Sequence, residues 1–344
     1  MPSEKFSDEY TYQKTLTTTT NYNYGAPLTN TMRSLRVLMQ NDGFDVATAP
    51  HLDGLRLQLA RDEREPILKS VGVNSKHILP TMTQSQVLRA CAVKFLRHVY
   101  MVRQAGARSV WVISIPQMYN HYVSNELYNR KDSPLDLHIR LEDTNERFTA
   151  QQKQLLGTGT NLALRWCQLA LRELTLAPLS STSRGRRLVR RWFTGPTRSD
   201  ARVDRYITEL TAGLRRIIAV LNSNKIIFTD MPSLRNSASA DDQRLANAMA
   251  FVYANRHEGL PIIYIENSFF TNSYLPLLET CAQTIIHEIT HLELGTSDHA
   301  YDFNGLTPDD KLTPRQAMEN ADSWGYFCCN AARAMSNAAM NRML

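Results

Sequence analysis

Two histidines and a glutamate stand close together in the pattern His-Glu-x-x-His, formed by His287, Glu288 and His291. On a helix, side chains four residues apart lie one turn above each other on the same face, so both imidazoles can reach one ion. The glutamate beside the first histidine can reach a water molecule on that ion. A catalytic zinc takes three protein ligands and keeps one position open. The pattern therefore predicts a helix that binds one Zn²⁺ per chain.

The third ligand is expected after the helix, where Gly295 can take the left-handed conformation that follows a last turn. Asp298 comes seven residues after His291, and a turn at the glycine would bring it back toward the histidines. Some zinc peptidases use a histidine six residues after the second one, but that position is Ser297 here. Others take a glutamate from a later helix, and Glu319 is the alternative of that kind. We expect Asp298 to complete the site.

The residues after the second histidine resemble a known family. The stretch from Gly295 to Tyr301 matches the motif Gly-Thr-x-Asp-x-x-Tyr, which follows His-Glu-x-x-His in the aspzincins, the deuterolysin and peptidyl-Lys metalloendopeptidase group. Further on, residues 319–327 resemble the Asn-Ala-Asp segment on the last helix of the same family. The resemblance runs from about residue 155 onward, and its specific motifs lie in roughly the last sixty residues.

The resemblance implies a zinc-dependent endopeptidase that hydrolyses peptide bonds in proteins or peptides. It places the metal on three residues, His287, His291 and Asp298. It implies that Glu288 is the general base toward a metal-activated water, and that Tyr301 lies near the scissile carbonyl and stabilises the oxyanion. The alternative is a protein that keeps the zinc site without proteolytic activity and acts as a binding module. A fourth protein ligand, such as His299 or Glu293, would indicate that alternative.

Three positions are candidates for contact with the substrate: Asp322, Ile263 and Ile265. The resemblance leaves two roles open for Asp322, which are attraction of a cationic side chain and a hydrogen bond to a ligand histidine. Lysine-specific members of the family place a second acid three residues after the matching aspartate. That position is Gly325 here, so strict lysine specificity is not expected. The strand before the active-site helix could pair with an extended substrate through Ile263 and Ile265.

Periodic apolar residues predict the elements that position these side chains. The stretch 277–294 carries an apolar stripe at helical spacing and is followed by a glycine. Downstream, Thr313 opens a helix with a capping box and a proline in its first turn, and we expect that alanine-rich helix to reach about Ala339. The other expected helices and strands lie at 83–104, 109–115, 201–221, 225–229, 248–253 and 261–266.

The length of 344 residues allows two domains, and 43% hydrophobic residues are enough for a core. We expect an α+β fold in which residues 151–344 form a zincin-like metalloprotease domain around the His-Glu-x-x-His helix. A smaller α/β region over residues 1–150 is expected to precede it, and the sequence does not define its role. The first 30 or so residues are rich in Thr, Asn and Tyr and are expected to be flexible.

Basic residues give the chain a net charge of +6, and several of them lie in the segment 184–191, next to Trp192 and Phe193. Basic side chains beside aromatic ones can bind phosphate and stack on bases. No nucleic-acid-binding motif accompanies the segment, so we expect a solvated helix face whose two aromatic residues pack into the core. A nucleic-acid-binding module built on residues 184–191 is the alternative partner class.

Five cysteines show no framework spacing, which favours reduced core thiols. Residues 1–10 contain no apolar stretch of the kind found in secretory signal peptides, and no run of about 18 apolar residues predicts a membrane span. Deuterolysin-type members are secreted, and the lack of such an apolar stretch departs from that pattern. We therefore expect synthesis in the cytoplasm and export by a dedicated secretion system, as for a bacterial effector or toxin. A secretion-system or immunity protein would then be a partner. Tight regulation inside the producing cell is the alternative. Finding the protein only in the cytosol of the producing cell would refute export.

Overall fold

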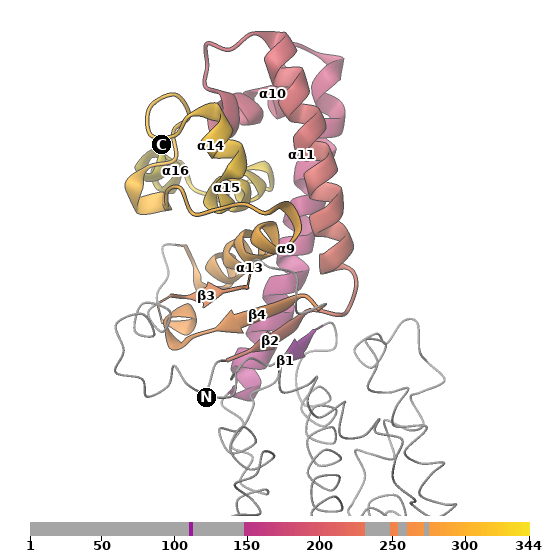
Figure 1. Cartoon of the computed structure of the whole chain (residues 1–344), viewed down its shortest axis with the longest axis vertical. Helices are drawn as coiled ribbons and strands as arrows, with labels where there is room; N and C mark the ends of the chain where they lie inside the picture. The colour runs from indigo at the N-terminus through magenta and orange to yellow at the C-terminus, as the bar shows by residue number, and fades with distance from the viewer. Residues whose placement is uncertain (1–109, 113–147, 231–247, 254–259, 272–274) are drawn as a thin grey trace, which may run out of the picture. The chain divides into compact units, whose positions relative to one another are not determined.

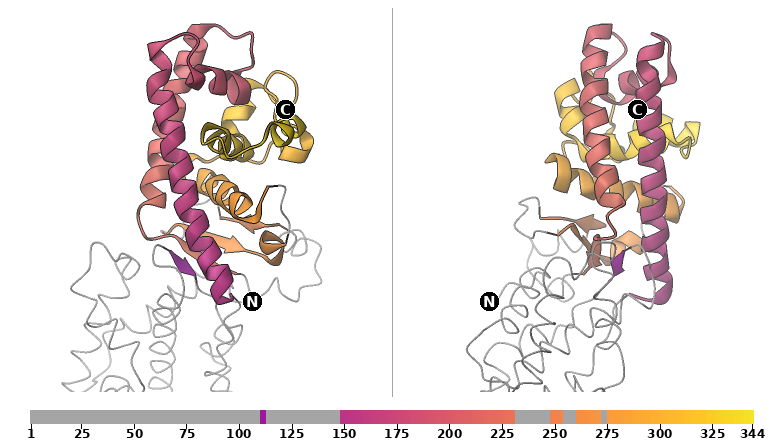
Figure 2. Two further views of the ribbon diagram at one scale, coloured as in Figure 1. Left: turned by 180° about the vertical axis from the view of Figure 1, so that it is seen from behind. Right: turned by 90° about the vertical axis from the view of Figure 1, so that its right-hand side faces the viewer.

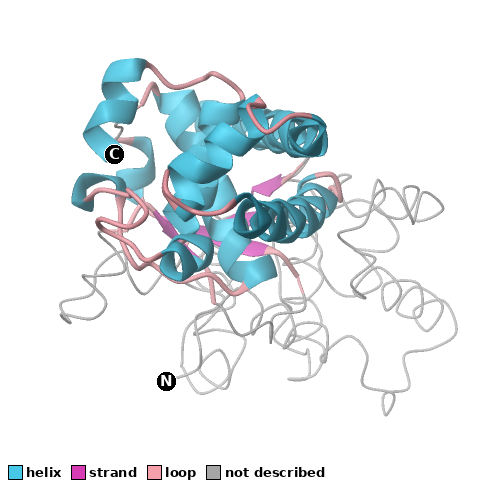
Figure 3. Ribbon diagram, turned by 90° about the horizontal axis from the view of Figure 1, so that it is seen from above, coloured by secondary structure: helices cyan, strands magenta, loops and turns pink. Residues whose placement is uncertain are grey.

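The computed structural model describes residues 110–112, 148–230, 248–253, 260–271 and 275–344. The chain divides into two compact units. The first comprises Met1–Lys153, Ile227–Ala246 and Glu258–Leu260, and the second comprises Gln154–Ile226, Asn247–His257 and Pro261–Leu344. The described residues form an α+β structure that is rich in helix and has short strands (Figure 3).

In the first unit, two short strands form a parallel pair. Strand β1 (Trp111–Val112) pairs with β2 (Ile227–Thr229), with Trp111 opposite Ile227. Both strands are buried along their whole length, as expected for parallel strands, which are usually covered on both faces. They lie within the strands predicted at 109–115 and 225–229. The predicted helix at 83–104 and the first 30 residues lie outside the described residues, and the boundary near residue 150 remains a prediction.

In the second unit, β3 (Ala250–Phe251) pairs in antiparallel fashion with β4 (Ile262–Ile265). Phe251 lies opposite Tyr264, and their rings stack with centroids 5.1 Å apart. The pair confirms the strands predicted at 248–253 and 261–266, while part of the turn between them lies outside the described residues.

Two long helices dominate the second unit. Helix α11 (Asp200–Leu221) confirms the predicted amphipathic helix, because its apolar residues recur every three or four positions and are buried. Helix α9 (Ala150–Leu176) begins four residues before the second unit and was not predicted. Figure 1 and both views of Figure 2 show the two helices aligned with each other, with α13 (Leu277–Leu294) crossing beside them.

The core of this unit forms around α15 (Ala321–Ala331), in which every residue is buried. Helix α15 packs against α13, and α11 packs against α13 as well. Gly213 of α11 allows this close packing, since a Cβ there would lie 2.5 Å from the ring of Trp324. Phe193 fills the space beside α15 and meets the ring of Phe327 edge-on, with centroids 5.2 Å apart. The active-site helix therefore rests on a buried helix.

The prediction of one helix from residue 314 to about Ala339 is wrong. Three helices occupy this stretch, and they are α14 (Pro314–Glu319), α15 and α16 (Asn337–Met343). Asn320 breaks the first two apart with an extended backbone, φ −100° and ψ 118°. Its buried side chain accepts hydrogen bonds from the backbone N–H groups of His299 and Ala300 at 2.9 and 3.0 Å. The break thus holds the loop that follows α13, a role that alanine-rich composition does not reveal.

The arginine-rich segment is engaged within the protein. It forms α10 (Arg184–Val189) and a π-helical turn over Arg190–Thr194, and both Trp192 and Phe193 are fully buried. Arg184 donates to the carbonyl oxygens of Asn330 and Ala331, at the end of α15, at 2.8 and 2.9 Å. The burial of both rings confirms that the aromatic pair packs into the core, as predicted, but the predicted solvated face is wrong in part, because Arg186 is buried. The arginine at the start of the segment serves as a cap for α15.

Candidate active site

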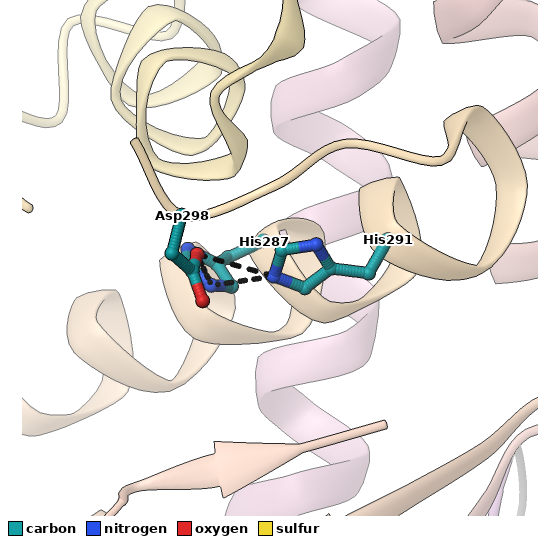
Figure 4. A group of neighbouring side chains, drawn as sticks. All are labelled: His287, His291 and Asp298. Atoms are coloured by element: carbon teal, nitrogen blue, oxygen red, sulfur yellow. Dashed lines mark hydrogen bonds and ion pairs between the residues drawn. The ribbon is translucent and has the colours of Figure 1, made fainter. Parts of the chain in front are cut away.

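Helix α13 presents both histidines to the same side (Figure 4). The helix begins after Pro276 and ends at Gly295, which takes the left-handed conformation with φ +69°. The chain then turns back, and Ser297 forms backbone hydrogen bonds with Glu319 and Ala321 on either side of the break at Asn320. This short bridge brings Asp298 opposite the two histidines, so the glycine and the bridge together build the site that the sequence predicts.

The three candidate ligands meet at nearly equal distances (Figure 4). The two Nε2 atoms of His287 and His291 lie 3.1 Å apart, and Asp298 Oδ1 lies 3.1 and 3.2 Å from them. Zinc with ligands at about 2.0–2.1 Å in tetrahedral geometry separates neighbouring ligand atoms by roughly 3.3 Å. The triangle of donor atoms therefore fits one face of a tetrahedral zinc site.

Hydrogen bonds at Nδ1 of His287 and His291 determine that each ring points the lone pair of its Nε2 toward the centre of the triangle. His287 Nδ1 lies 2.7 Å from Asp322 Oδ1, and His291 Nδ1 lies 2.8 Å from the backbone carbonyl oxygen of Thr296. Both partners are acceptors, so each Nδ1 carries the proton and each neutral ring directs its Nε2 lone pair toward Asp298. Three acceptor atoms within 3.2 Å of one another require a cation between them. The donor set thus fits a metal.

Without a metal, protons would take its place. Burial lowers the pKa of His287, but hydrogen bonds to Asp298 and Asp322 outweigh it and hold that pKa well above its usual value. Burial raises the pKa of Asp298, but hydrogen bonds from the two histidines outweigh it and hold that pKa well below its usual range. Both shifts reflect the attraction of this cluster for positive charge.

The two predicted catalytic side chains flank the metal ligands. Glu288 is 3% exposed, and its Oε1 lies 3.9 Å from Nε2 of His287. Burial raises the pKa of Glu288, which makes its carboxylate a stronger base than one in water. Tyr301 lies over His287 with nearly parallel rings, centroids 6.4 Å apart, and stays 40% exposed. Burial, followed by the charge of Asp298, raises the pKa of Tyr301, so its hydroxyl keeps its proton.

The alternative ligands lie elsewhere. Glu319 pairs with Arg315 at 2.8 Å, and its other oxygen lies 3.8 Å from Nε2 of His299. Glu293 pairs with Arg216 at 3.6 Å. Among the residues that the structure describes, the group that could hold a metal comprises only His287, His291 and Asp298. Within that part of the chain, no fourth side chain closes the site.

Asp322 lies behind His287, in a buried position. Besides the bond to Nδ1 of His287, its Oδ1 accepts a hydrogen bond from Gln283 Nε2 at 3.0 Å, and its Oδ2 accepts one from the backbone N–H of Asp302 at 3.0 Å. Of the two roles that the sequence leaves open, the geometry favours the bond to a ligand histidine. Asp322 therefore orients the ring of His287 and fixes its tautomer.

Replacing Asp322 by asparagine should weaken zinc binding by about 10–100-fold, because the substitution removes the charged acceptor that holds Nδ1–H of His287. Competition with a chelator of known zinc affinity would measure the change. The matched control is Asp310→Asn, at an exposed residue whose carboxylate lies 3.9 Å from the Lys311 ammonium group. Equal zinc affinity in the Asp322→Asn variant and the wild type would show that Asp322 does not support the ligand.

A cavity of about 480 Å³ opens beside the metal ligands. Its wall includes Glu288, Tyr301, Asp322 and the stretch from Ala248 to Val252, which contains β3. Ile263 and Ile265 are not in this wall, because they lie in β4 and are buried with no more than 1% exposure. Within the described residues, β3 and not β4 borders the cavity, so a substrate contact of Ile263 and Ile265 remains a prediction.

The cavity wall also contains residues that sequence reasoning missed, among them Gln283 and Phe303. Gln283 lies four residues before His287, so the helical spacing that relates the histidines also places it on the same face. Phe303 stacks on Tyr301 with centroids 5.5 Å apart and is 68% exposed, so it extends the wall outward. The sequence gives no comparable signal for Phe303.

Comparison with protein families agrees with this geometry. Residues 179–329 match the model of the Aspzincin M35 family, described as lysine-specific metallo-endopeptidase. This match supports an aspzincin-type metalloendopeptidase domain in the C-terminal part of the chain. The matched residues include α11, α13, the ligand loop and α14, so the whole candidate site lies inside the aspzincin-type domain. No curated protein matches the chain. None of the helices in the described part of the chain is long and apolar enough to span a membrane.

Proposed function

We propose that this chain is a zinc-dependent endopeptidase and that His287, His291 and Asp298 would hold its metal. The observation that carries the proposal is the set of three acceptor atoms within 3.2 Å of one another, with both histidine Nδ1 atoms already committed to other acceptors. The match of residues 179–329 to a metalloendopeptidase family supports the same conclusion. When bound, zinc would act as a Lewis acid that polarises the peptide carbonyl and acidifies water.

The protein's own side chains would handle the protons. Glu288 accepts a proton from the attacking water at a carboxylate oxygen and delivers it to the departing amine. Its burial favours this role, because a raised pKa lets the carboxylate hold the proton between the two steps. Tyr301 lines the cavity and keeps its proton, and its hydroxyl would donate a hydrogen bond to the oxyanion.

The cavity wall suggests how the substrate lies. Strand β3 borders the cavity, and its pairing with β4 is antiparallel, with Ala250 opposite Ile265. An extended peptide can bind alongside a strand through main-chain hydrogen bonds. We infer that the peptide runs along the stretch from Ala248 to Val252, with its scissile bond next to Glu288.

The test compares the wild type with the Glu288→Gln variant. Glutamine keeps the shape of the side chain and leaves all three ligands in place, so elemental analysis should find one zinc per chain in both proteins. Cleavage of a peptide mixture, followed by mass spectrometry, should fall by about 10²–10⁴-fold in the variant, since a general base contributes that much. Unchanged cleavage by the variant would remove Glu288 from the mechanism, and no zinc in either protein would refute the proposed function.

The delivery of the protein remains a separate hypothesis. We propose export by a dedicated secretion system into a target cell, because the chain resembles a family that has secreted members. Tracking a tagged full-length chain in culture fractions and in neighbouring cells would test it. Detection only in the cytosol of the producing cell under every condition would refute it.

A further inference from the structure

A second cavity, of about 700 Å³, is lined by α11, the end of α13, α14 and the start of α15. Gly295 and Thr296 belong to its wall, whereas the next two residues of the same loop, Ser297 and Asp298, belong to the wall of the cavity beside the metal ligands. The proposed mechanism makes no use of this second cavity. We call it the arginine cavity, because four of its wall residues are Arg202, Arg205, Arg216 and Arg315.

Helix α11 supplies one long side of the arginine cavity. The wall residues on this side are spaced three or four positions apart and therefore share one face of the helix, and they are Arg202, Arg205, Glu209, Ala212 and Arg216. All five are exposed. They cover fourteen positions, which corresponds to about 21 Å along a helix axis. The cavity therefore offers an elongated row of charges with one acid in the middle.

Two of the four arginines already have partners. Arg315 pairs with Glu319 at 2.8 Å, and Arg216 pairs with Glu293 at 3.6 Å. In the part of the chain that the structure describes, no acidic side chain forms an ion pair with Arg202 or Arg205. These two guanidinium groups lie three residues apart on the same face, so both can bind carboxylates of one ligand.

The floor of the arginine cavity suits apolar side chains and not nucleic-acid bases. Trp324 is 3% exposed, and its Nε1–H donates to the carbonyl oxygen of Met318 at 2.8 Å. Tyr206 is 9% exposed. Neither ring offers the open face on which a base could stack. Leu294 and Met318 are part-exposed and provide apolar surface instead.

The position of Glu209 separates two kinds of anionic ligand. A polyphosphate or a nucleic acid carries a negative charge at every unit, so it would place one beside this carboxylate, and like charges repel. A peptide can place acidic side chains opposite Arg202 and Arg205, and an uncharged one opposite Glu209. Its apolar side chains can also contact Leu294 and Met318. The charge pattern and the floor together favour a peptide.

We propose that the arginine cavity binds an acidic segment of a partner protein, whose carboxylates pair with Arg202 and Arg205. The bound segment would contact Thr296, whose carbonyl oxygen lies 2.8 Å from Nδ1 of His291. The partner would therefore touch the loop that orients a candidate metal ligand. The inference does not depend on peptidase activity.

The experiment measures the binding of two fluorescent peptides to the full-length chain by anisotropy. One peptide alternates glutamate and alanine, and the other carries glutamine in place of glutamate. Each has about ten residues, enough to span the row of charges at roughly 3.3 Å per residue. The protein carries the Glu288→Gln substitution, which keeps the probe intact if the chain cleaves peptides. The glutamate peptide should bind at least about ten times more tightly, and its affinity should fall as NaCl is raised.

The variant that tests the cavity combines Arg202→Gln with Arg205→Gln. It should weaken binding of the glutamate peptide by about five- to ten-fold, as expected for the loss of two ion pairs. The matched control combines Arg165→Gln with Arg172→Gln, at two exposed residues of α9 outside the cavity wall. It removes the same net charge and should keep the wild-type affinity. Circular dichroism checks that both variants fold.

A substitution of the opposite sign gives a further test. Glu209→Gln removes the acid from the row and should tighten binding of the glutamate peptide, whereas Asp310→Asn removes one negative charge outside the wall and should not. No gain from Glu209→Gln would contradict the placement of the peptide along α11.

Equal affinity for the two peptides, no effect of NaCl, or equal losses in the two double variants would overturn the inference. Inorganic polyphosphate and single-stranded DNA of the same charge as the peptide serve as competitors. Tighter binding of either one, with the same dependence on Arg202 and Arg205, would assign the cavity to a phosphate ligand and overturn the acidic peptide. Failure of the proposed function is distinguishable, because these measurements record neither bound zinc nor cleavage.

Discussion

Replacing His291 by alanine should remove zinc from the protein and lower peptide cleavage by on the order of 10⁴-fold, because several kcal/mol of transition-state stabilisation disappear with the metal. His291 is a better ligand to replace than His287, because its removal disturbs the rest of the structure less. Its Nδ1 partner is the neutral backbone carbonyl of Thr296, just past the end of α13, and a neutral carbonyl loses less than a buried carboxylate when one hydrogen bond is removed. Removing His287 would leave the buried carboxylate of Asp322 without its 2.7 Å partner and would disturb folding as well.

The measurements are zinc per chain by elemental analysis and kcat/KM on one cleaved peptide. Circular dichroism checks that the helices remain. The matched control is His299→Ala, since His299 lies in the same loop but contacts Glu319 at 3.8 Å and not the metal ligands. The control should keep one zinc and most of its activity. Retention of one tightly bound zinc by the His291→Ala variant would show that the metal is held by other groups.

The sequence could predict that the three candidate metal ligands lie together, because the geometry that unites them is local. Helical spacing fixes His287 and His291 on one face, and a left-handed glycine lets the chain return within a few residues. The third ligand, Asp298, needs one tertiary contact, the backbone bridge between Ser297 and the break at Asn320. The sequence does not reveal this contact, but the resemblance to the family motif points to Asp298, so Asp298 could be chosen over Glu319.

The substrate side of the site could not be predicted in the same way. Which strand borders the cavity depends on strand pairing across a turn, and both β3 and β4 are short apolar stretches. Gln283 of α13 and Gly325 of α15 are 42 residues apart in the sequence, yet a Cβ on Gly325 would lie only 2.8 Å from Gln283 Nε2, and only the packing of the two helices reveals this contact. The break at Asn320 has the same origin, since a buried side chain that caps a loop overrides the helix propensity of its neighbours.

The arginine-rich segment leads to a second prediction with a large effect, this time on stability. Replacing Trp192 by alanine should lower the free energy of unfolding by about 3–5 kcal/mol, as expected for a large aromatic side chain removed from a packed core. Trp192 is fully buried, and its ring stacks on Tyr326 with centroids 6.3 Å apart. Its Nε1–H donates to Asn330 Oδ1 at 3.1 Å, so the substitution also removes a buried hydrogen bond.

Urea denaturation of the zinc-free proteins, followed by circular dichroism, would measure the difference, and removing zinc keeps metal binding out of the comparison. The matched control is Arg187→Ala, at an exposed residue of α10, which directly precedes the turn that carries Trp192, and it should change stability by no more than about 0.5 kcal/mol. A loss below about 1 kcal/mol for Trp192→Ala would mean that the ring is not part of the core. Trp192 would then be available to stack on a base, and nucleic-acid binding by residues 184–191 would again be a possible function of this segment. A loss of the expected size instead assigns Trp192 to the support of α15, the buried helix that carries Asp322 beneath the metal ligands.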